Sequence, residues 1–310
     1  MMNFIFGQRK NADTSVNVST DQTERQTSTT GLEDQCKDAH SDLTAQEQLD
    51  KLANTHEDGT DTTRDSSSET NIRQVFCHWH GDCSGSMYTM GNAGYKEGKN
   101  FCSEWRTFGK SNPQIKTEIS FYTFSAEGNL VFRGDASRLT DTDIEKCGIA
   151  MTPDSTTCLY DTAVEQAKCF LANINAAYND IPEDENKSKN IKDHISSTFM
   201  LMTDGIDNMS NKYNGADLRK IFEELKKIGT TVCFAAANMD AINVGKDYGL
   251  DRNACLQMGS DHSSGGSGLR AMTDAAIRTA TRSRDSNDES CEIFTQAERL
   301  QSCEPTLNRN

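Results

Sequence analysis

Hydrophobic positions in the middle of the chain change repeatedly between the spacing of strands and the spacing of helices. From Ile72 onward, short apolar runs alternate with stretches in which apolar residues recur every three or four positions. Such alternation predicts an α/β fold in which a mostly parallel sheet carries helices on both faces. We expect strands at 73–79, 119–124, 130–132, 195–202 and 231–237, and helices at 159–174, 218–228 and 269–277.

Two turn signals add detail to this pattern. Glu127, Gly128 and Asn129 form a short polar turn between two strand-like runs, which predicts a β-hairpin and therefore one antiparallel pair of strands. Gly229 directly follows the second predicted helix. It is placed to end that helix, because glycine readily adopts the left-handed conformation found at helix C-termini.

Polar residues dominate both ends of the chain. Residues 1–70 contain 14 acidic and 6 basic side chains, and this part is rich in Ser and Thr. Too few large apolar groups occur there to offset the entropic cost of ordering the backbone. We therefore expect a disordered, acidic, Ser/Thr-rich leader at 1–71, one folded domain at 72–282, and a disordered acidic tail at 283–310.

The protein is acidic, with a net charge of -15 and a mean hydropathy of -0.71. Such a chain is repelled by phosphate backbones and anionic membranes, which argues against nucleic acid as a partner. No stretch reaches the length of a membrane span, and the apolar N-terminus ends at Gly7, well short of a secretory signal. We expect a soluble cytoplasmic protein whose 11 cysteines are mostly buried thiols.

Oxygen-bearing side chains follow two of the predicted strands. Asp82, Ser84 and Ser86 come after the first strand, Asp204 follows the fourth, and Thr157 stands just before a helix. In parallel sheets, ligands bind at the carboxyl ends of the strands. Carboxylates and hydroxyls are hard donors that suit the oxygen coordination of Mg²⁺ and Mn²⁺. We therefore predict that these five residues bind Mg²⁺ or Mn²⁺ at the carboxyl edge of the sheet.

Three segments carry a family resemblance: residues 82–87 (DCSGSM), 156–161 (TTCLYD) and 201–208 (LMTDGIDN). In this order they resemble the metal-ion-dependent adhesion site of von Willebrand factor A domains. The resemblance implies a six-stranded, doubly wound, Rossmann-like sheet with strand order 3-2-1-4-5-6 and the hairpin at one edge. Residues 234–245 are also similar to small, stand-alone intracellular or microbial members of the family.

The resemblance also implies a role for each of the five residues. Ser84 and Ser86 would ligate the metal directly. Asp82 and Asp204 would act largely through water, and Thr157 directly or through water. The metal would keep one open coordination position, which a carboxylate of a partner protein can fill. The family thus implies a divalent-metal-dependent protein-binding module whose partner presents an acidic residue.

Two features of the sequence depart from the family pattern. Ser155 stands where the family often has glycine, so that Thr156 competes with Thr157 for the ligand position, and the spacing to the following helix favours Thr157. His78 and His80 interrupt the first strand, and Cys77 and Cys83 beside them raise the alternative of a zinc site. Those cysteines point to the other face of the strand, however, so we expect the two histidines to be structural.

The residues around the predicted metal site have further expected roles. Asp207 and Asn208 are expected to order their loop rather than to bind the ion. Specificity for the partner is expected from three loops around the ion, at 88–105, 208–214 and 261–267.

Two alternatives to the binding module stay open: a metal-assisted hydrolase and a metal-free structural domain. Ser84 does not lie in G-x-S-x-G, and the chain has neither a P-loop nor a G-x-G-x-x-G turn after the first strand. A hydrolase would also need a general base, for which His80 is the candidate. Because no catalytic constellation is evident, we favour a binding module over an enzyme.

Overall fold

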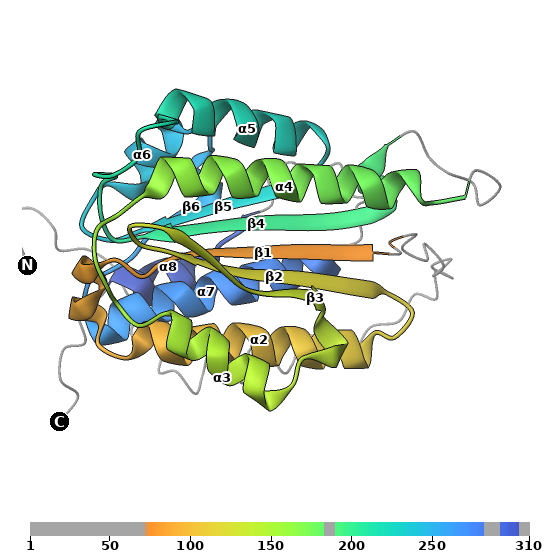
Figure 1. Ribbon diagram of the computed structural model, residues 1–310, viewed down its shortest axis with the longest axis horizontal. Helices are drawn as coiled ribbons and strands as arrows, with labels where there is room; N and C mark the ends of the chain where they lie inside the picture. Colours follow the sequence, from red (N-terminus) through yellow and green to blue (C-terminus); the bar gives the residue numbers. More distant parts are fainter. Residues whose placement is uncertain (1–71, 73, 183–189, 282–291, 304–310) are drawn as a thin grey trace, which may run out of the picture. The chain divides into compact units, whose positions relative to one another are not determined.

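Six strands form one sheet in the order β3-β2-β1-β4-β5-β6 (Figure 1). β3 pairs antiparallel with β2, whereas the other neighbouring strands pair in parallel. The expected fold class, a doubly wound and mostly parallel sheet with one antiparallel edge strand, is therefore confirmed. The strands are β1 Gln74–Asp82, β2 Lys116–Phe124, β3 Gly128–Asp135, β4 Ile195–Thr203, β5 Thr231–Ala236 and β6 Cys255–Gln257.

The computed structural model describes residues 72, 74–182, 190–281 and 292–303. All of them belong to one unit of the chain, residues 66–310. The expected leader at 1–71, and residues 283–291 and 304–310 of the expected tail, lie outside the described residues. The predictions of disorder for these segments stay predictions.

Helices cover both faces of the sheet (Figure 1). Helices α2 (Ala93–Ser111), α3 (Asp141–Ala150) and α7 (His262–Thr281) pack on one face, and α4 (Leu159–Asn179), α5 (Gly215–Lys227) and α6 (Ala241–Asp247) on the other. Short 3₁₀ helices lie at η1 Gly85–Met90, η2 Ala136–Arg138, η3 Ile191–Asp193 and η4 Arg252–Ala254. Because β1 is buried on both faces, its alternate residues face different cores: Cys77 and Trp79 lie in one and Phe76 in the other.

The predicted hairpin and helix end are present in the structure. Residues 125–127 connect β2 to β3, so that the antiparallel edge pair is the hairpin expected from the turn signal. Gly229 follows α5 with a φ of 87°, and its amide donates to the Lys226 carbonyl at 2.9 Å. Glycine is therefore the residue that ends this helix, as its conformational freedom predicts.

The expectation of a loop at 88–105 is wrong for residues 93–105, which belong to α2. Glycines such as Gly98 weaken the local helix signal. A Cβ built on Gly98 would lie 3.1 Å from Cζ of Phe121 and 3.2 Å from the carbonyl oxygen of Cys147. The glycine thus marks the place where α2 approaches the sheet and α3, a tertiary contact that local spacing does not reveal.

The expected loop at 261–267 is likewise helical from residue 262 onward, because it forms the start of α7. Gly265 and Gly266 in this stretch, and Gly268 directly after it, favour a loop in a sequence reading. A Cβ built on Gly265 would lie 2.9 Å from Sδ of Met90, and one built on Gly268 would lie 2.4 Å from Cγ of Met258. These glycines allow close packing of the helix, whereas the expected loop at 208–214 does lack regular structure.

Residues 292–303 differ from the disordered tail expected over 283–310, because they pack against the sheet edge and α7. Phe294 is fully buried in the same core as α7. Helix α8 (Gln296–Cys303) follows it and lies beside α7 and β6. A helix of eight residues that carries one acidic and one basic side chain, preceded by a single large buried apolar anchor, has too weak a local pattern for the sequence to predict it.

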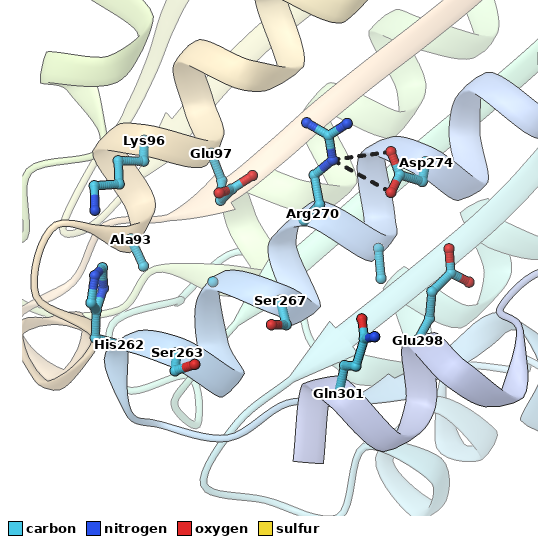
Figure 2. Close-up of a pocket in the computed structure, with 12 residues that line it drawn as sticks. Ala93, Lys96, Glu97, His262, Ser263, Ser267, Arg270, Asp274, Glu298 and Gln301 are labelled. Carbon is cyan, nitrogen blue, oxygen red and sulfur yellow. Dashed lines mark hydrogen bonds and ion pairs between the residues drawn. The ribbon is translucent and has the colours of Figure 1, made fainter. Parts of the chain in front are cut away.

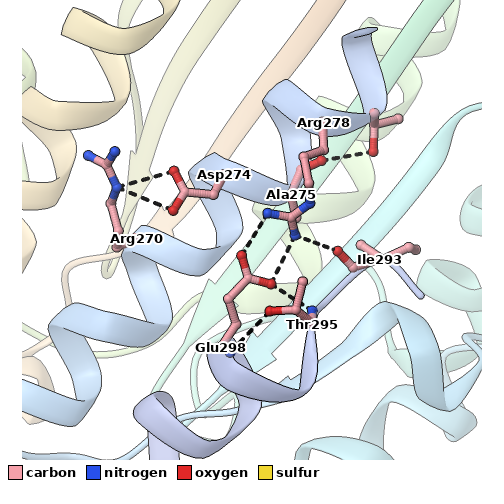
Figure 3. Close-up of polar contacts among 8 residues, drawn as sticks. Arg270, Asp274, Ala275, Arg278, Ile293, Thr295 and Glu298 are labelled. Carbon is pink, nitrogen blue, oxygen red and sulfur yellow. Dashed lines mark hydrogen bonds and ion pairs between the residues drawn. The ribbon is translucent and has the colours of Figure 1, made fainter. Parts of the chain in front are cut away.

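Polar contacts fasten α8 to its neighbours (Figure 3). The guanidinium of Arg278 in α7 donates to both carboxylate oxygens of Glu298, at 2.7 and 2.9 Å, and to the Ile293 carbonyl at 2.8 Å. Arg299 donates to the carbonyl of Cys255 in β6 at 2.7 Å. Because Arg299 satisfies a carbonyl of the edge strand β6, which α8 contacts, this helix also covers part of that edge.

The described cysteines fit the expectation of buried thiols. Of the nine in the described part of the chain, seven are buried and none is in a disulfide, while Cys169 and Cys303 are exposed. As for membrane association, none of the helices within the described ranges is long and apolar enough to cross a bilayer.

Candidate metal centre

Asp82, the last residue of β1, is held in one orientation by two hydrogen bonds. Its Oδ1 accepts from the Ser84 amide at 2.7 Å, and its Oδ2 accepts from Oγ of Thr203 at 2.6 Å. Thr203 ends β4, the strand that pairs with β1. Thr203 was not expected to take part in the site, because its only signal in the sequence is its position directly before Asp204.

A chain of short polar contacts joins three more of the predicted ligands. Oγ of Ser84 and Oγ of Ser86 are 3.1 Å apart, and Ser86 Oγ donates to Oδ1 of Asp204 at 2.6 Å. Ser84 and Asp204 are buried, whereas Ser86 is exposed to solvent. Residues 118 positions apart in the sequence thus meet at the carboxyl ends of β1 and β4.

Thr157 reaches the same place from the loop that precedes α4. A Cβ built on Gly205 would lie 3.5 Å from Oγ of Ser86 and 3.8 Å from Oγ of Thr157. Thr157 is buried, whereas Thr156 is exposed. The structure therefore brings Thr157, rather than Thr156, toward the other four predicted residues.

Asp207 and Asn208 order the loops of the site, as their predicted role requires. Oδ1 of Asp207 accepts from the amides of Leu159 and Tyr160 at 2.7 and 3.3 Å, where α4 begins. A carboxylate at this position stabilises the helix N-terminus, whose first amides have no partner within the helix. Oδ1 of Asn208 accepts from the Thr157 amide at 2.9 Å, which fixes the backbone of a predicted ligand.

Ser155 occupies a backbone conformation that favours glycine. Its φ is 64°, in the left-handed region. Its carbonyl accepts from the Gly85 amide at 2.9 Å, and this bond ties the loop before α4 to the loop after β1. Serine in place of the family's glycine therefore keeps the hydrogen bond between the two loops. Its energetic cost is the strained backbone conformation of Ser155.

Burial controls the charge of the two aspartates. It raises the pKa of Asp82 to about 6, against the lowering effect of the hydrogen bonds from Thr203 and Ser84. Burial also raises the pKa of Asp204, against the hydrogen bond from Ser86. Oδ2 of Asp204 is buried without a hydrogen-bond partner among the described residues. Such an oxygen is costly to leave unpaired, and a cation bound beside it would offset that cost.

The donor set fits a hard divalent ion. Within the described ranges, no group of three or more His, Cys, Asp or Glu residues is assembled for a metal. The five predicted residues supply instead two carboxylates and three hydroxyls. Oxygen donors with few charges are typical ligands of Mg²⁺ and Mn²⁺, which retain several water ligands, whereas zinc in structural sites prefers thiolate and imidazole.

His78 and His80 lie inside the protein, away from solvent. Nδ1 of His78 is 2.6 Å from Oγ of Ser120, its Nε2 is 3.4 Å from Nδ1 of His80, and Nε2 of His80 is 3.2 Å from Oγ of Thr162. His80 also stacks on the ring of Phe124, with centroids 4.8 Å apart. All four ring nitrogens therefore have protein partners, which supports the structural role expected for this pair.

The alternation along β1 separates these histidines from the thiol of Cys77. Cys77 lies in the core beneath α2 and α7, whereas the rings that stack on His78 lie in the core beneath α4 and α5. Burial lowers the pKa of His80 to about 3. An imidazole that is fully buried and this weakly basic is unsuited to act as the general base of a hydrolase.

Comparison with known proteins gives matches in structure but not in sequence. No model of a protein family matches this chain, and no curated protein matches it either. Proximal thread matrix protein 1 from the mussel byssus is 15% identical, with a TM-score of 0.43 over 68% of this chain and 46% of that one. Our chain thus spans about half of the mussel chain.

Two further solved structures are similar at comparable levels. The manganese-loaded TRAP protein of Plasmodium vivax is 14% identical, with a TM-score of 0.35 over 62% of this chain and 70% of that one. The vWF domain of the type V pili tip protein Mfa5 from Porphyromonas gingivalis is 10% identical, with a TM-score of 0.44 over 67% and 95%.

The strand order provides the basis for assigning the fold. It is the order 3-2-1-4-5-6 that the resemblance in the three segments implied, with the hairpin at the edge and helices on both faces. The loops that follow β1 and β4 and the loop that precedes α4 meet at the carboxyl edge, where a doubly wound sheet binds its ligands. The described part of this chain therefore has the fold of a von Willebrand factor A domain.

Proposed function

We propose that this protein is a divalent-metal-dependent protein-binding module of the von Willebrand factor A type. Asp82, Ser84, Ser86, Thr157 and Asp204 would hold Mg²⁺ or Mn²⁺, and an acidic residue of a partner protein would complete the coordination. The observation that carries the proposal is the contact of Ser86 with both Ser84 and Asp204, beside a buried carboxylate oxygen of Asp204 that accepts no hydrogen bond from the described residues.

The accessibility of the site supports capture from solution rather than a closed structural site. Asp82, Ser84, Thr157 and Asp204 are buried, so they are positioned by the protein core. Ser86 is exposed and forms the solvent side of the cluster. The bound ion would supply positive charge and a free coordination position at this side, which a carboxylate can neutralise and fill.

The net charge of the chain agrees with a cation as the bridging element. An acidic partner would be repelled by a protein of net charge -15 unless a local positive charge attracted it. A divalent ion on the protein surface provides that charge. Binding should therefore depend on the metal even where the surrounding contacts are favourable.

Metal titration by calorimetry tests the first half of the proposal. We expect Mg²⁺ and Mn²⁺ to bind with one ion per chain and to raise the melting temperature by mass action. Asp82→Asn and Asp204→Asn keep the side-chain volume while removing charge, and each should abolish measurable binding. Asp154→Asn, an exposed acid on a neighbouring loop, is the matched control and should bind normally. Absence of any metal binding by the wild-type protein would favour the metal-free structural domain.

Capture of a partner tests the second half. The immobilised protein is exposed to cell extract in Mn²⁺, and bound proteins are released with EDTA. We expect one or more proteins that elute with EDTA and that do not bind the Asp204→Asn variant. Partners that bind equally well to this variant, or that resist EDTA, would contradict a metal-bridged contact.

A further inference from the structure

An apolar pocket of about 470 Å³ opens beside the candidate metal centre. It lies among α4, α5, α6 and the loop after β4, on the face of the sheet that these helices cover. Gly205 and Ile206, which directly follow Asp204, form part of its wall. Tyr160, Gly215, Ala216, Arg219, Asp247 and Tyr248 also line it.

Two tyrosines form an aromatic wall of this pocket. Tyr160 and Tyr248 pack edge to face, with ring centroids 6.1 Å apart, and their hydroxyls are 3.3 Å from each other. A Cβ built on Gly215 would touch both rings, at 3.5 to 3.8 Å. Tyr160 is partly exposed, whereas Tyr248 is buried, so Tyr160 is the ring of this pair that a ligand can reach.

Ile206 is the most exposed large apolar side chain within the described residues, with 76% of its surface accessible. It lines the pocket and follows Asp204 by two residues. Met209, on the same loop, is 46% exposed. Apolar groups held in water next to a pocket are typical of a surface that is covered in a complex.

Three of the lining residues, Asp207, Arg219 and Asp247, are charged. Asp207 already accepts from the amides of Leu159 and Tyr160. Nε of Arg219 donates to Oε1 of Glu223 one turn further along α5, at 3.0 Å, so that this cation already has a partner. Asp247 is exposed at the end of α6. The interior of the pocket is therefore suited to an apolar group rather than to a second charge.

The other side of the sheet provides a contrast. A pocket of about 340 Å³ among α2, α7 and α8 is lined by charged and polar side chains, where Arg270 pairs with Asp274 (Figure 2). Lys96, Glu97 and Glu298 also face it. These two pockets thus differ in chemistry, the one beside α4, α5 and α6 being mainly apolar and the one among α2, α7 and α8 mixed and charged.

The distance between the metal centre and the apolar pocket is short. Gly205 belongs to the pocket wall, and a Cβ on it would lie within 3.8 Å of Ser86 Oγ and of Thr157 Oγ. An extended peptide advances about 3.3 Å per residue, so that side chains two positions apart are about 7 Å apart on the same face. One peptide segment can therefore reach both places.

We propose that the pocket binds a large aromatic or aliphatic side chain of the partner. This side chain belongs to the same peptide segment as the carboxylate that completes the coordination of the metal ion. The recognised segment would carry an acidic residue with a large apolar residue one or two positions away. This inference rests on the proposed function and adds the chemistry of the partner to it. The apolar anchor supplies the specificity that a carboxylate alone lacks, because buried aromatic and aliphatic anchors dominate the energy of most protein interfaces.

Selection from a random peptide library displayed on phage tests this inference with the full chain. Panning is done in Mn²⁺ and in EDTA, on the wild type and on two variants. Ala216→Trp places a large ring in the pocket. Lys220→Trp, on the exposed side of the same helix and outside the pocket lining, is the matched control. Melting temperatures and Mn²⁺ titration verify that both variants are folded and bind metal.

We expect the wild type and Lys220→Trp to enrich, only in Mn²⁺, peptides with an acidic residue and a large apolar residue one or two positions away. Ala216→Trp should keep the Mn²⁺-dependent preference for acid and lose the preference for the apolar residue. A synthetic peptide from the selection should lose affinity at least about tenfold when its apolar residue is changed to alanine, as expected for the loss of a buried anchor.

Three outcomes would overturn the inference. Enrichment of acidic peptides without an apolar neighbour would leave the metal-dependent module standing and remove the role of the pocket. If the Ala216→Trp variant selects peptides with the same apolar residue, that residue binds outside the pocket. If the wild type enriches no peptide in a Mn²⁺-dependent way, both this inference and the proposed function fail.

Discussion

Asn208 and Thr157 bind each other through two hydrogen bonds, although 51 residues separate them. The Asn208 amide donates to the Thr157 carbonyl at 3.0 Å, and the Thr157 amide donates to Oδ1 of Asn208 at 2.9 Å. This pair joins the loop after β4 to the loop before α4. It therefore controls how close Thr157 comes to Asp204, without placing Asn208 itself in the cluster.

Asn208→Ala should weaken Mn²⁺ binding by about 10- to 100-fold, the range found when groups that orient metal ligands are removed. Calorimetric titration measures the change. Asn208→Asp keeps the acceptor oxygen and should recover most of the affinity. Asn211→Ala removes an amide side chain from the same loop and should bind like the wild type. Equal affinity in Asn208→Ala and the wild type would show that the pair does not position Thr157.

Ser155→Gly should stabilise the protein by up to about 1 kcal/mol. A left-handed conformation costs a non-glycine residue roughly 1–2 kcal/mol, and the greater entropy loss of glycine on folding offsets part of the gain. Ser155 has a φ of 64° and an exposed side chain, so that little contact is lost. Urea denaturation measures the free energy of unfolding.

Ser155→Val is the opposite control for this position, because a β-branched residue is especially unfavourable at positive φ. It should lower the free energy of unfolding below that of the wild type. If glycine and valine have the same effect, strain at residue 155 is not what limits the stability of this loop.

His80 should make the metal-free protein less stable in acid. Its pKa falls from an ordinary value of 6.5 to about 3 on folding, because burial disfavours the charged ring. The unfolded chain therefore takes up a proton below pH 6.5 that the folded protein refuses until about pH 3. Above pH 6.5, His80 is neutral in both states and does not reduce the free energy of unfolding. Below pH 6.5, the free energy of unfolding decreases by about 1.4 kcal/mol per pH unit, down to about pH 3.

His80→Gln isolates this effect, because glutamine is polar and of similar size but does not titrate. Chemical denaturation in EDTA is compared at pH 7.0 and pH 5.0. The wild type should lose about 2 kcal/mol more than the variant over this interval. An identical pH dependence in the two proteins would mean that the ring becomes charged within the fold. Thr162 keeps a partner in the variant, because its hydroxyl donates to the Cys158 carbonyl at 2.6 Å.

Phe294→Ala should destabilise the protein by about 3–5 kcal/mol, the usual cost of removing a buried phenylalanine. Phe294 is fully buried beside α7, outside the range first expected to fold. Leu300→Ala, on α8 with 54% of its surface exposed, is the matched control and should change stability by less than about 0.5 kcal/mol. Thermal and urea unfolding report both. Similar small effects for the two variants would indicate that α8 contributes little to the fold.

Much of the fold and the placement of the candidate site could be predicted from local patterns. Apolar runs and helical spacing are properties of neighbouring residues, so β4, β5, α4 and α5 agree with the segments expected at 195–202, 231–237, 159–174 and 218–228. The same patterns place Asp82 and Asp204 at strand ends. Parallel strands share one carboxyl edge, and the prediction that these two residues meet there follows from that rule.

Several elements escaped prediction because their local signals are weak. Helix α2 contains glycines that allow close packing against β2 and α3. Helix α8 is held in place by Phe294 and by polar contacts to α7 and β6. The short strand β6 and helix α6 also lack a periodic apolar pattern long enough to predict. Contacts with distant residues, rather than propensity, stabilise these parts.

The sequence by itself determined which residues carry oxygen donors and on which strand ends they lie, because side-chain chemistry and strand periodicity are local. Only the tertiary structure decided that Ser86 bonds to Asp204, that Thr203 orients Asp82, and that an apolar pocket opens next to Gly205. Each of these facts depends on the relative position of chain segments far apart in sequence. That position is set by the packing of two cores across one sheet, which no short stretch of residues encodes.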